Sequence, residues 1–346
     1  MKLSQALQYV KKCILSTRPI MLISAPGLGK TQGIKAITKS IICFDNLPPD
    51  LMICHPIVDS EIDYKGLPGF NKITGLAEFF PYGKLRQMLE AKRPLVVFVD
   101  DFAQASQSVQ KAFMQLFDER SIDGKKISEF VTFVIATNDA SHGAGASNQL
   151  SPIVSRMRAS ITIEPDAGDW LSSFALKDNN IVPELCAFIK SNPEYISTFD
   201  KDTVRSGKPF ACPRSIKFLS DWIESNDIDQ ELWVSCVGEK FISKFWGFYS
   251  LYKTVAPIVP QVLSNGANAQ IPNSANGVWS ICCALANIVN PANVIQFENI
   301  ALYTNRLDAE MAAFFWTFAA MRNPSVKNST HYTSFVLANS DLMINS

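Results

Sequence analysis

The chain has 346 residues, of which 47% are hydrophobic and 18% charged, which is typical of a globular protein and excludes a disordered or fibrous one. Lysine plus arginine and aspartate plus glutamate number 32 each, so no overall charge directs the chain to nucleic acid. The eight cysteines and three histidines are scattered and form no C-x-x-C pair, which argues against a structural zinc site and favours reduced thiols.

No segment predicts attachment to a membrane. The first residues alternate polar and apolar side chains and lack the apolar segment of a signal peptide. The longest apolar run, residues 277–289, is shorter than the ~20 residues needed to cross a bilayer. We therefore expect a soluble, cytoplasmic protein.

The N-terminal part predicts a helix, a buried strand and a phosphate-binding loop in succession. Helical periodicity covers residues 4–17, and four apolar residues at 20–23 predict the strand. The loop is close to the template G-x-x-x-x-G-K-[ST], with serine where the first glycine is usual, and it consists of Ser24, Ala25, Pro26, Gly27, Leu28, Gly29, Lys30 and Thr31. In such a loop backbone N–H groups surround the phosphates, the lysine reaches the terminal phosphates and the hydroxyl binds Mg²⁺.

Predicted strands and helices then alternate. Strands are predicted over 41–44, 52–55, 95–101 and 130–137, and helices over 32–40, 83–91 and 106–120. Turn residues predict a hairpin around 71–75 and another at Asp123-Gly124. This alternation indicates an α/β domain in which a parallel sheet lies between two layers of helices.

Beyond Pro165 the pattern becomes helical. Helices are predicted over 170–176, 182–191, 214–225, 229–252, 277–289 and 308–321, with a linker or long loop over 264–276 and a polar tail, partly strand or coil, after Met321. The helix at 308–321 is apolar on nearly every side, so we expect it to be buried, either within this subunit or against another. We expect three domains: the α/β core (1–165), a helical lid (166–255) and a C-terminal helical extension of unknown role (256–346).

Polar residues at the ends of two apolar strands could complete a nucleotide site. Asp100 and Asp101 follow the apolar run 96–99, which places Asp100 near the hydration shell of Mg²⁺ and Asp101 next to the attacking water. Asn138 ends the strand predicted at 130–137, where its carboxamide can orient water. Arg156 could reach a neighbouring subunit's nucleotide, and Arg214, at the start of a predicted helix, could sense the terminal phosphate in its own subunit.

In this order the motifs resemble those of the AAA+ ATPases and, in detail, of their MoxR-like branch. The segment Asp63-Tyr-Lys-Gly-Leu-Pro68 looks like the D-x-x-G-x-P segment after the second strand of that family. The turn at Asp123-Gly124 is similar to the hairpin before sensor 1. The residues Glu164-Pro-Asp166 with Asp169-Trp170 resemble the passage into the lid, and Pro213-Arg214 resembles the sensor 2 signature. The resemblance covers roughly residues 1–250.

The resemblance implies a P-loop AAA+ core that binds ATP and Mg²⁺ and hydrolyses the nucleotide. It assigns phosphate binding to Ser24–Thr31, Mg²⁺ binding to Thr31 and Asp100, polarisation of water to Asp101, sensor 1 to Asn138, the trans arginine finger to Arg156 and sensor 2 to Arg214. Arg158 competes with Arg156 for the finger role. Asp101 replaces the usual glutamate and is one methylene shorter, so slow hydrolysis is an open alternative.

The resemblance also implies partners. Family members work as rings, usually hexamers, because a neighbour's arginine completes each site. A homo-oligomeric ring that remodels a protein client, often with a von Willebrand factor A-domain partner, is therefore expected. Residues 60–82 correspond to an insert in the core, and Phe70, Phe79 and Phe80 there are candidates for contact with the client. Packing of Phe79 and Phe80 on the core is the alternative.

Two other functions remain open from the sequence alone. One is a nucleotide-gated assembly scaffold with slow or negligible hydrolysis, which the short Asp101 side chain favours. The other is a nucleic-acid motor or loader on the same fold. The neutral net charge argues against that motor, but a local basic surface is available in Lys72, Lys84, Arg86, Lys92 and Arg93. DNA-stimulated hydrolysis with a steep salt dependence would identify it.

Overall fold

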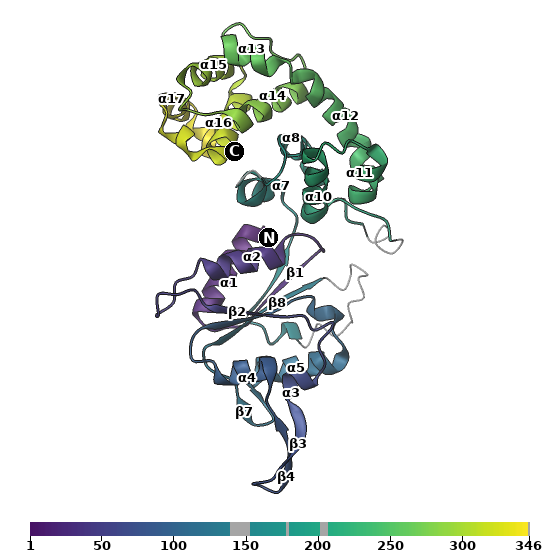
Figure 1. Ribbon diagram of the computed structural model, residues 1–346. Coiled ribbons are helices and arrows are strands. Elements are labelled where there is room, and N and C mark those ends of the chain that lie inside the picture. The colour runs from purple at the N-terminus through teal and green to yellow at the C-terminus, as the bar shows by residue number, and fades with distance from the viewer. Residues whose placement is uncertain (139–152, 178–179, 201–206, 345–346) are drawn as a thin grey trace. The chain divides into compact units, whose positions relative to one another are not determined.

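The computed structural model describes residues 1–138, 153–177, 180–200 and 207–344 (Figure 1). The chain divides into two compact units. The first contains Met1–Pro165 with Phe199–Gly207, and the second contains Asp166–Thr198 with Lys208–Ser346. Each unit has its own hydrophobic core.

A five-stranded parallel sheet forms the centre of the first unit. Its strands lie in the order β2-β5-β8-β1-β9 and comprise Ile20–Ser24 (β1), Asp50–Cys54 (β2), Leu95–Val99 (β5), Val131–Asn138 (β8) and Ala159–Ile163 (β9). Every adjacent pair runs parallel, and β1 lies between β8 and β9. The parallel sheet of the predicted α/β core is thereby confirmed.

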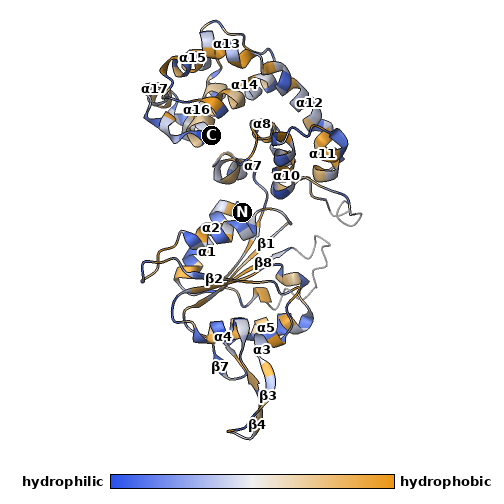
Figure 2. Cartoon of the chain, viewed as in Figure 1, coloured by the Kyte–Doolittle hydropathy of each residue, from blue (hydrophilic) through white to orange (hydrophobic). Residues whose placement is uncertain are grey.

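Helices cover both faces of the sheet and give three layers (Figure 1). On one face α1 (Leu3–Leu15) and α2 (Lys30–Lys39) share a buried cluster with Val96 and Phe98 of β5. On the other face α3 (Ile62–Lys65), α4 (Gly83–Glu90) and α5 (Gln107–Asp118) pack with Val97 and Val99. Successive residues of a strand point to opposite faces, so a strand covered on both sides needs a continuous apolar run. Figure 2 shows this hydrophobic character along the central strands.

Two short segments of the first unit differ from expectation. The prediction of a strand at 41–44 is wrong. The N–H of Cys43 donates a hydrogen bond to the carbonyl oxygen of Leu47, so the segment forms a turn. The strand β9 is not predicted by the sequence pattern. It lies at the edge of the sheet, and only Ile161 and Ile163 of its five residues are buried, so its apolar signal is short.

Both predicted hairpins are present. The strands β6 (Ser121–Ile122) and β7 (Lys125–Lys126) pair around the Asp-Gly turn, and β3 (Leu67–Asn71) pairs with β4 (Leu76–Phe80). The β3–β4 hairpin projects away from the sheet of its unit (Figure 1). Phe70, Ile73 and Leu76 on this hairpin are 67%, 96% and 62% exposed, so its tip is an apolar surface in contact with water.

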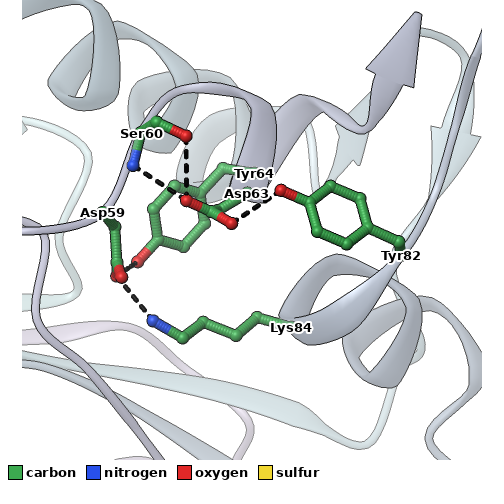
Figure 3. A network of polar contacts seen from close by, with 6 residues as sticks. All are labelled: Asp59, Ser60, Asp63, Tyr64, Tyr82 and Lys84. Carbon is green, nitrogen blue, oxygen red and sulfur yellow. Dashed lines mark hydrogen bonds and ion pairs between the residues drawn. The ribbon is translucent and has the colours of Figure 1, made fainter.

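A polar network fixes the base of the β3–β4 hairpin (Figure 3). It comprises Asp59, Ser60, Asp63, Tyr64, Tyr82 and Lys84. The carboxylate of Asp63 accepts hydrogen bonds from Tyr82 Oη at 2.7 Å and from the N–H and Oγ of Ser60 at 2.8 and 2.9 Å. Lys84 Nζ lies 2.6 Å from the carboxylate of Asp59, which also accepts from Tyr64. The segments before and after the hairpin are thereby tied to α3 and α4.

The second unit is helical. Its helices of eight or more residues are α8 (Pro183–Ser191), α10 (Pro213–Glu224), α11 (Gln230–Val237), α12 (Glu239–Val255), α13 (Ile258–Asn265), α14 (Ala275–Ile288), α15 (Val294–Thr304), α16 (Ala309–Arg322) and α17 (Thr330–Ala338). Shorter helices, α7 (Ala167–Trp170) and α18 (Ser340–Ile344), lie at its two ends, and a π-helical segment, Leu171–Ala175, follows α7.

Three expectations for this unit need correction. The segment predicted as one helix at 229–252 forms two helices, which are separated by Gly238 with a φ of 85°. An added Cβ at Gly238 would clash with the backbone of Pro209. The predicted loop at 264–276 is shortened at both ends by α13 and α14. The tail after Met321 is helical, since Ser329 caps α17 and Tyr332 and Phe335 of that helix pack against the core.

One buried cluster runs through the second unit from Ala167 to Val326. The rings of Phe188, Phe241 and Phe245 pack within it, with centroids 5.1 to 5.6 Å apart. Phe315 and Trp316 of α16 are 0% and 1% exposed, which confirms that the helix predicted at 308–321 is buried and places it within this subunit. The predicted division between lid and extension at residues 255 and 256 stays a prediction.

All eight cysteines are free thiols. Cys186, Cys282 and Cys283 lie in the core of the second unit, and burial raises the pKa of each thiol. Within the described ranges, no cluster of three or more His, Cys, Asp or Glu side chains could hold a metal ion. No helix in those ranges is long and apolar enough to cross a bilayer.

Candidate nucleotide-binding site

The predicted phosphate-binding loop connects β1 to α2. Ser24 is the last residue of β1, and Gly29, in the left-handed conformation, directly precedes Lys30 at the start of α2. Ala25 and Leu28 of the loop are buried in the cluster beneath α1 and α2. The first N–H groups of a helix have no partner within the helix and carry a partial positive charge, so this end of α2 suits a phosphate.

Lys30 is buried although its side chain carries a charge, with 7% of the residue exposed. Its Nζ donates a hydrogen bond to Ser24 Oγ at 2.6 Å and lies 3.4 Å from Asn138 Oδ1 and 3.5 Å from the carbonyl oxygen of Ala25. Burying an ammonium is costly unless oxygen atoms replace its water. These oxygen atoms therefore account for its position at the edge of the sheet.

Thr31 and Asp100 form the second part of the site. Thr31 Oγ1 donates a hydrogen bond to Asp100 Oδ2 at 2.7 Å, and the N–H of Asp101 donates to Asp100 Oδ1 at 3.1 Å. Both carboxylate oxygens of Asp100 are thus held in fixed directions. The contact arises because β5 and β1 flank β8, so their carboxyl ends meet at one edge of the sheet.

The carboxylate of Asp101 is directed toward Asn138. Asn138 Nδ2 lies 3.4 Å from Asp101 Oδ1, a long hydrogen bond between the ends of neighbouring strands. Asp101 has φ 52° and ψ 38°, a left-handed conformation that costs a residue with a side chain about 1–2 kcal/mol. Aspartate tolerates this conformation better than most residues, and here it turns the chain directly after β5. The structure thus brings together Lys30, Thr31, Asp100, Asp101 and Asn138, all from the predicted site.

The oxygen atoms of Thr31 and Asp100 fit a magnesium ion. A hydroxyl and a carboxylate are hard oxygen ligands, and they lie within one hydrogen bond of each other. In the part of the chain that the structure describes, one hydrogen bond brings these two groups together, whereas Mg²⁺ takes six ligands and usually keeps several waters. We therefore expect the metal to arrive with a nucleotide, whose phosphate oxygens complete the shell.

No protein-family model matches the sequence, and no curated protein matches it. Solved structures with some likeness include a point mutant of Thermotoga maritima RuvB, at 15% identity and a TM-score of 0.39, covering 77% of this chain and 78% of that chain. The Thermotoga maritima RuvB Holliday junction branch migration motor has 13% identity and a TM-score of 0.36, with 74% and 76% covered. NtrX from Brucella abortus has 10% identity and a TM-score of 0.36, with 99% and 68% covered. These values are too low to assign a function.

Three arginines are candidates for the finger and sensor 2 roles, and none of these roles is tested by a described contact. Arg156 Nε lies 3.1 Å from Asp118 Oδ2 at the end of α5, and both side chains are partly exposed. Arg158 is exposed, and its N–H is donated to the carbonyl oxygen of Pro19. Arg214 is an exposed residue in the first turn of α10, in the second unit. The roles assigned to Arg156, Arg158 and Arg214 stay predictions.

Two buried polar residues outside the predicted site support its loops. Thr137 Oγ1, fully buried, accepts a hydrogen bond from the N–H of Ala103 at 3.2 Å and so ties the loop after Asp101 to β8. Gln110 Nε2, also buried, donates to the carbonyl oxygen of Ala105 at 3.1 Å. A polar residue at an otherwise apolar helix position, as Gln110 is in α5, is the signal that could have identified the second of them.

Proposed function

We propose that the protein is a Mg²⁺-dependent ATPase of the MoxR-like AAA+ type, which assembles into a ring and remodels a protein partner. The observation that carries this proposal is the meeting of five polar side chains at the carboxyl edge of the sheet, beside the first turn of α2. Ligands of open α/β sheets bind at this edge.

Each group in the cluster has a chemical task in the proposed reaction. Lys30 neutralises charge on the terminal phosphates, while Thr31 and Asp100 hold Mg²⁺, which when bound offsets the charge that develops on the phosphoryl oxygens. Asp101 accepts a proton from the attacking water. Asn138, 3.4 Å from both Lys30 Nζ and the Asp101 carboxylate, orients that water between them.

The proposed assembly and partner binding use two surface features of the first unit. Arg156 would complete a neighbour's site, and its ion pair with the partly exposed Asp118 is of the surface kind that contributes about 0–1 kcal/mol. The exposed tip of the β3–β4 hairpin, with Phe70 and Ile73, would contact the client, alone or with a von Willebrand factor A-domain partner. The network at its base (Figure 3) would hold this surface in place.

The test compares phosphate release and sedimentation velocity, with and without ATP and Mg²⁺, for wild type, Lys30→Ala and Arg156→Ala. We expect wild type to hydrolyse ATP and assemble, Lys30→Ala to bind ATP more weakly and lose turnover, and Arg156→Ala to assemble without turnover. Mixing the two variants should restore part of the activity, because each supplies the residue that the other lacks. Arg86→Ala, which removes another surface arginine paired with a carboxylate, is the control that keeps activity.

Other outcomes would replace parts of the proposal. Undiminished turnover in Arg156→Ala rejects the trans finger. Assembly that depends on ATP without phosphate release from wild type identifies the scaffold instead. Hydrolysis that DNA stimulates, with a steep loss at higher salt, identifies a nucleic-acid motor.

A further inference from the structure

Ser24 occupies the position of the first glycine in the phosphate-loop template. Among the described contacts of the Lys30 ammonium, the one with the Ser24 hydroxyl is the shortest. Ser24 Oγ lies 2.6 Å from Lys30 Nζ, and the two residues are 1% and 7% exposed. A glycine at this position would remove this contact, and the oxygens of Asn138 and Ala25 lie farther from the ammonium, at 3.4 and 3.5 Å.

The register of the sheet explains why two side chains reach the ammonium from the same side. Ser24 and Asn138 are paired residues at the ends of the parallel strands β1 and β8. Paired residues of neighbouring strands point to the same face, so their side-chain oxygens lie side by side. Together they form a support for Lys30 Nζ at the edge of the sheet.

The orientation of the Ser24 hydroxyl is also fixed. Its single proton is donated to the carbonyl oxygen of Ala25 at 2.8 Å. A hydroxyl has one proton and two lone pairs, so toward Lys30 it can act only as an acceptor. The dipole of the hydroxyl therefore favours the ammonium in this position.

We propose that Ser24 is a positioning residue that acts through Lys30, setting the ammonium where the terminal phosphates of a bound nucleotide lie. This inference rests on the proposed nucleotide site. A hydrogen bond to a charged group is stronger than one between neutral groups, so loss of the hydroxyl should raise the Kd for ATP about tenfold. Because Ser24 acts on ATP binding only through the ammonium, loss of its hydroxyl should not change the Kd for ATP once Lys30 is replaced by an uncharged residue.

The experiment is a double-mutant cycle with two readouts, the Kd for ATP and the midpoint of urea unfolding without nucleotide. The variants are Ser24→Ala, Ser24→Gly, Lys30→Met and Lys30→Met combined with Ser24→Ala. Ser24→Gly restores the residue of the template, so equal losses in the alanine and glycine variants assign the effect to the hydroxyl. Ser280→Ala is the matched control, since Ser280 is fully buried, donates to Asn276 at 2.7 Å and lies in the second unit.

We expect Ser24→Ala and Ser24→Gly to weaken ATP binding similarly. In the Lys30→Met background, Ser24→Ala should leave the Kd unchanged and should lower the unfolding midpoint less than in wild type, because only the bond to Ala25 is then lost. An unchanged Kd in both Ser24 variants would overturn the inference. Equal effects of Ser24→Ala in the wild-type and Lys30→Met backgrounds would also overturn it. If wild type binds no ATP, the proposed function fails, and the unfolding cycle still reports whether the hydroxyl and the ammonium are coupled.

Discussion

Thr31 Oγ1 donates its proton to Asp100 Oδ2 across 2.7 Å, which joins the first turn of α2 to the end of β5, 69 residues later in the chain. The bond places a hydroxyl and a carboxylate together beside the loop that precedes α2. It is the contact on which the proposed use of Mg²⁺ depends.

Asp100→Asn should remove most of the effect of Mg²⁺ on nucleotide binding. The amide oxygen can still accept the hydrogen bond from Thr31, but the amide lacks a second acceptor oxygen and the negative charge that favours a divalent cation. We expect the ratio of the Kd values measured in EDTA and in Mg²⁺ to fall by about tenfold, or about 1.4 kcal/mol. Titration of a fluorescent ATP analogue measures this ratio. Asp123→Asn, in the β6–β7 turn, is the control, and an unchanged ratio in Asp100→Asn would rule out the assigned role.

Asn138→Ala should separate binding from hydrolysis. The carboxamide contacts both Lys30 and Asp101, so its removal disturbs the position of the attacking water more than that of the phosphates. We expect kcat to fall on the order of 10²-fold, as when one oriented donor is removed from an active site, with a much smaller change in the Kd for ATP. Phosphate release at saturating ATP gives kcat. Parallel losses in both quantities would show that Asn138 acts mainly on binding.

The pH dependence of stability should report the hydrogen bond between Tyr82 and Asp63 (Figure 3). That bond, followed by those from Ser60, lowers the pKa of the Asp63 carboxyl. A lowered pKa in the folded state means that the carboxylate stabilises the fold above the ordinary pKa of aspartate, and that this stabilisation is lost as pH falls through the lowered value. The free energy of unfolding of wild type should therefore exceed that of Asp63→Asn at neutral pH, and the difference should shrink in acid.

Tyr82→Phe supplies the matched comparison. It removes the hydroxyl that donates to Asp63 and leaves the ring. The free energy of unfolding of Tyr82→Phe should therefore lose most of the pH dependence that Asp63 gives to wild type. Urea unfolding at a series of pH values measures it. A difference between wild type and Asp63→Asn that is constant with pH would contradict the assignment.

Gly66→Ala should detach the β3–β4 hairpin from its base. Gly66 has φ 102°, and an added Cβ would lie 2.7 Å from the carbonyl oxygen of Phe80, a backbone atom that cannot move aside easily. Gly75→Ala is the control, since Gly75 also has a positive φ, of 72°, but nothing lies within 4 Å of its Cβ position. We expect trypsin to cleave after Lys72 at least about tenfold faster in Gly66→Ala than in Gly75→Ala, because local opening exposes the chain. Equal rates would show that the hairpin does not depend on this close contact.

The sequence predicts most of the first unit because its signals are local. A continuous apolar run gives β5, the Asp-Gly turn gives the β6–β7 hairpin, and the polar residues at the strand ends follow from the motif order. Their convergence follows from parallel strands, whose carboxyl ends share one edge. The contact between Ser24 and Lys30 could not be predicted, since it depends on the rotamers of two side chains.

The second unit is harder to predict because tertiary packing decides its elements. Residues 294–304 and 330–338 have weak helical patterns, yet both segments are helices because their apolar side chains complete the core around Trp316. The break at Gly238 likewise depends on the backbone of Pro209, which no local pattern reveals.

The buried thiols of the second unit can report how often this unit opens. Cys186 and Cys282 have pKa values raised by burial to about 12, so at neutral pH very little reactive thiolate is present while the helices stay packed. An alkylating reagent can therefore modify them only during excursions that admit water to the interior. The labelling rate, followed by mass spectrometry, would compare how often this unit opens with and without nucleotide, and no added probe is needed.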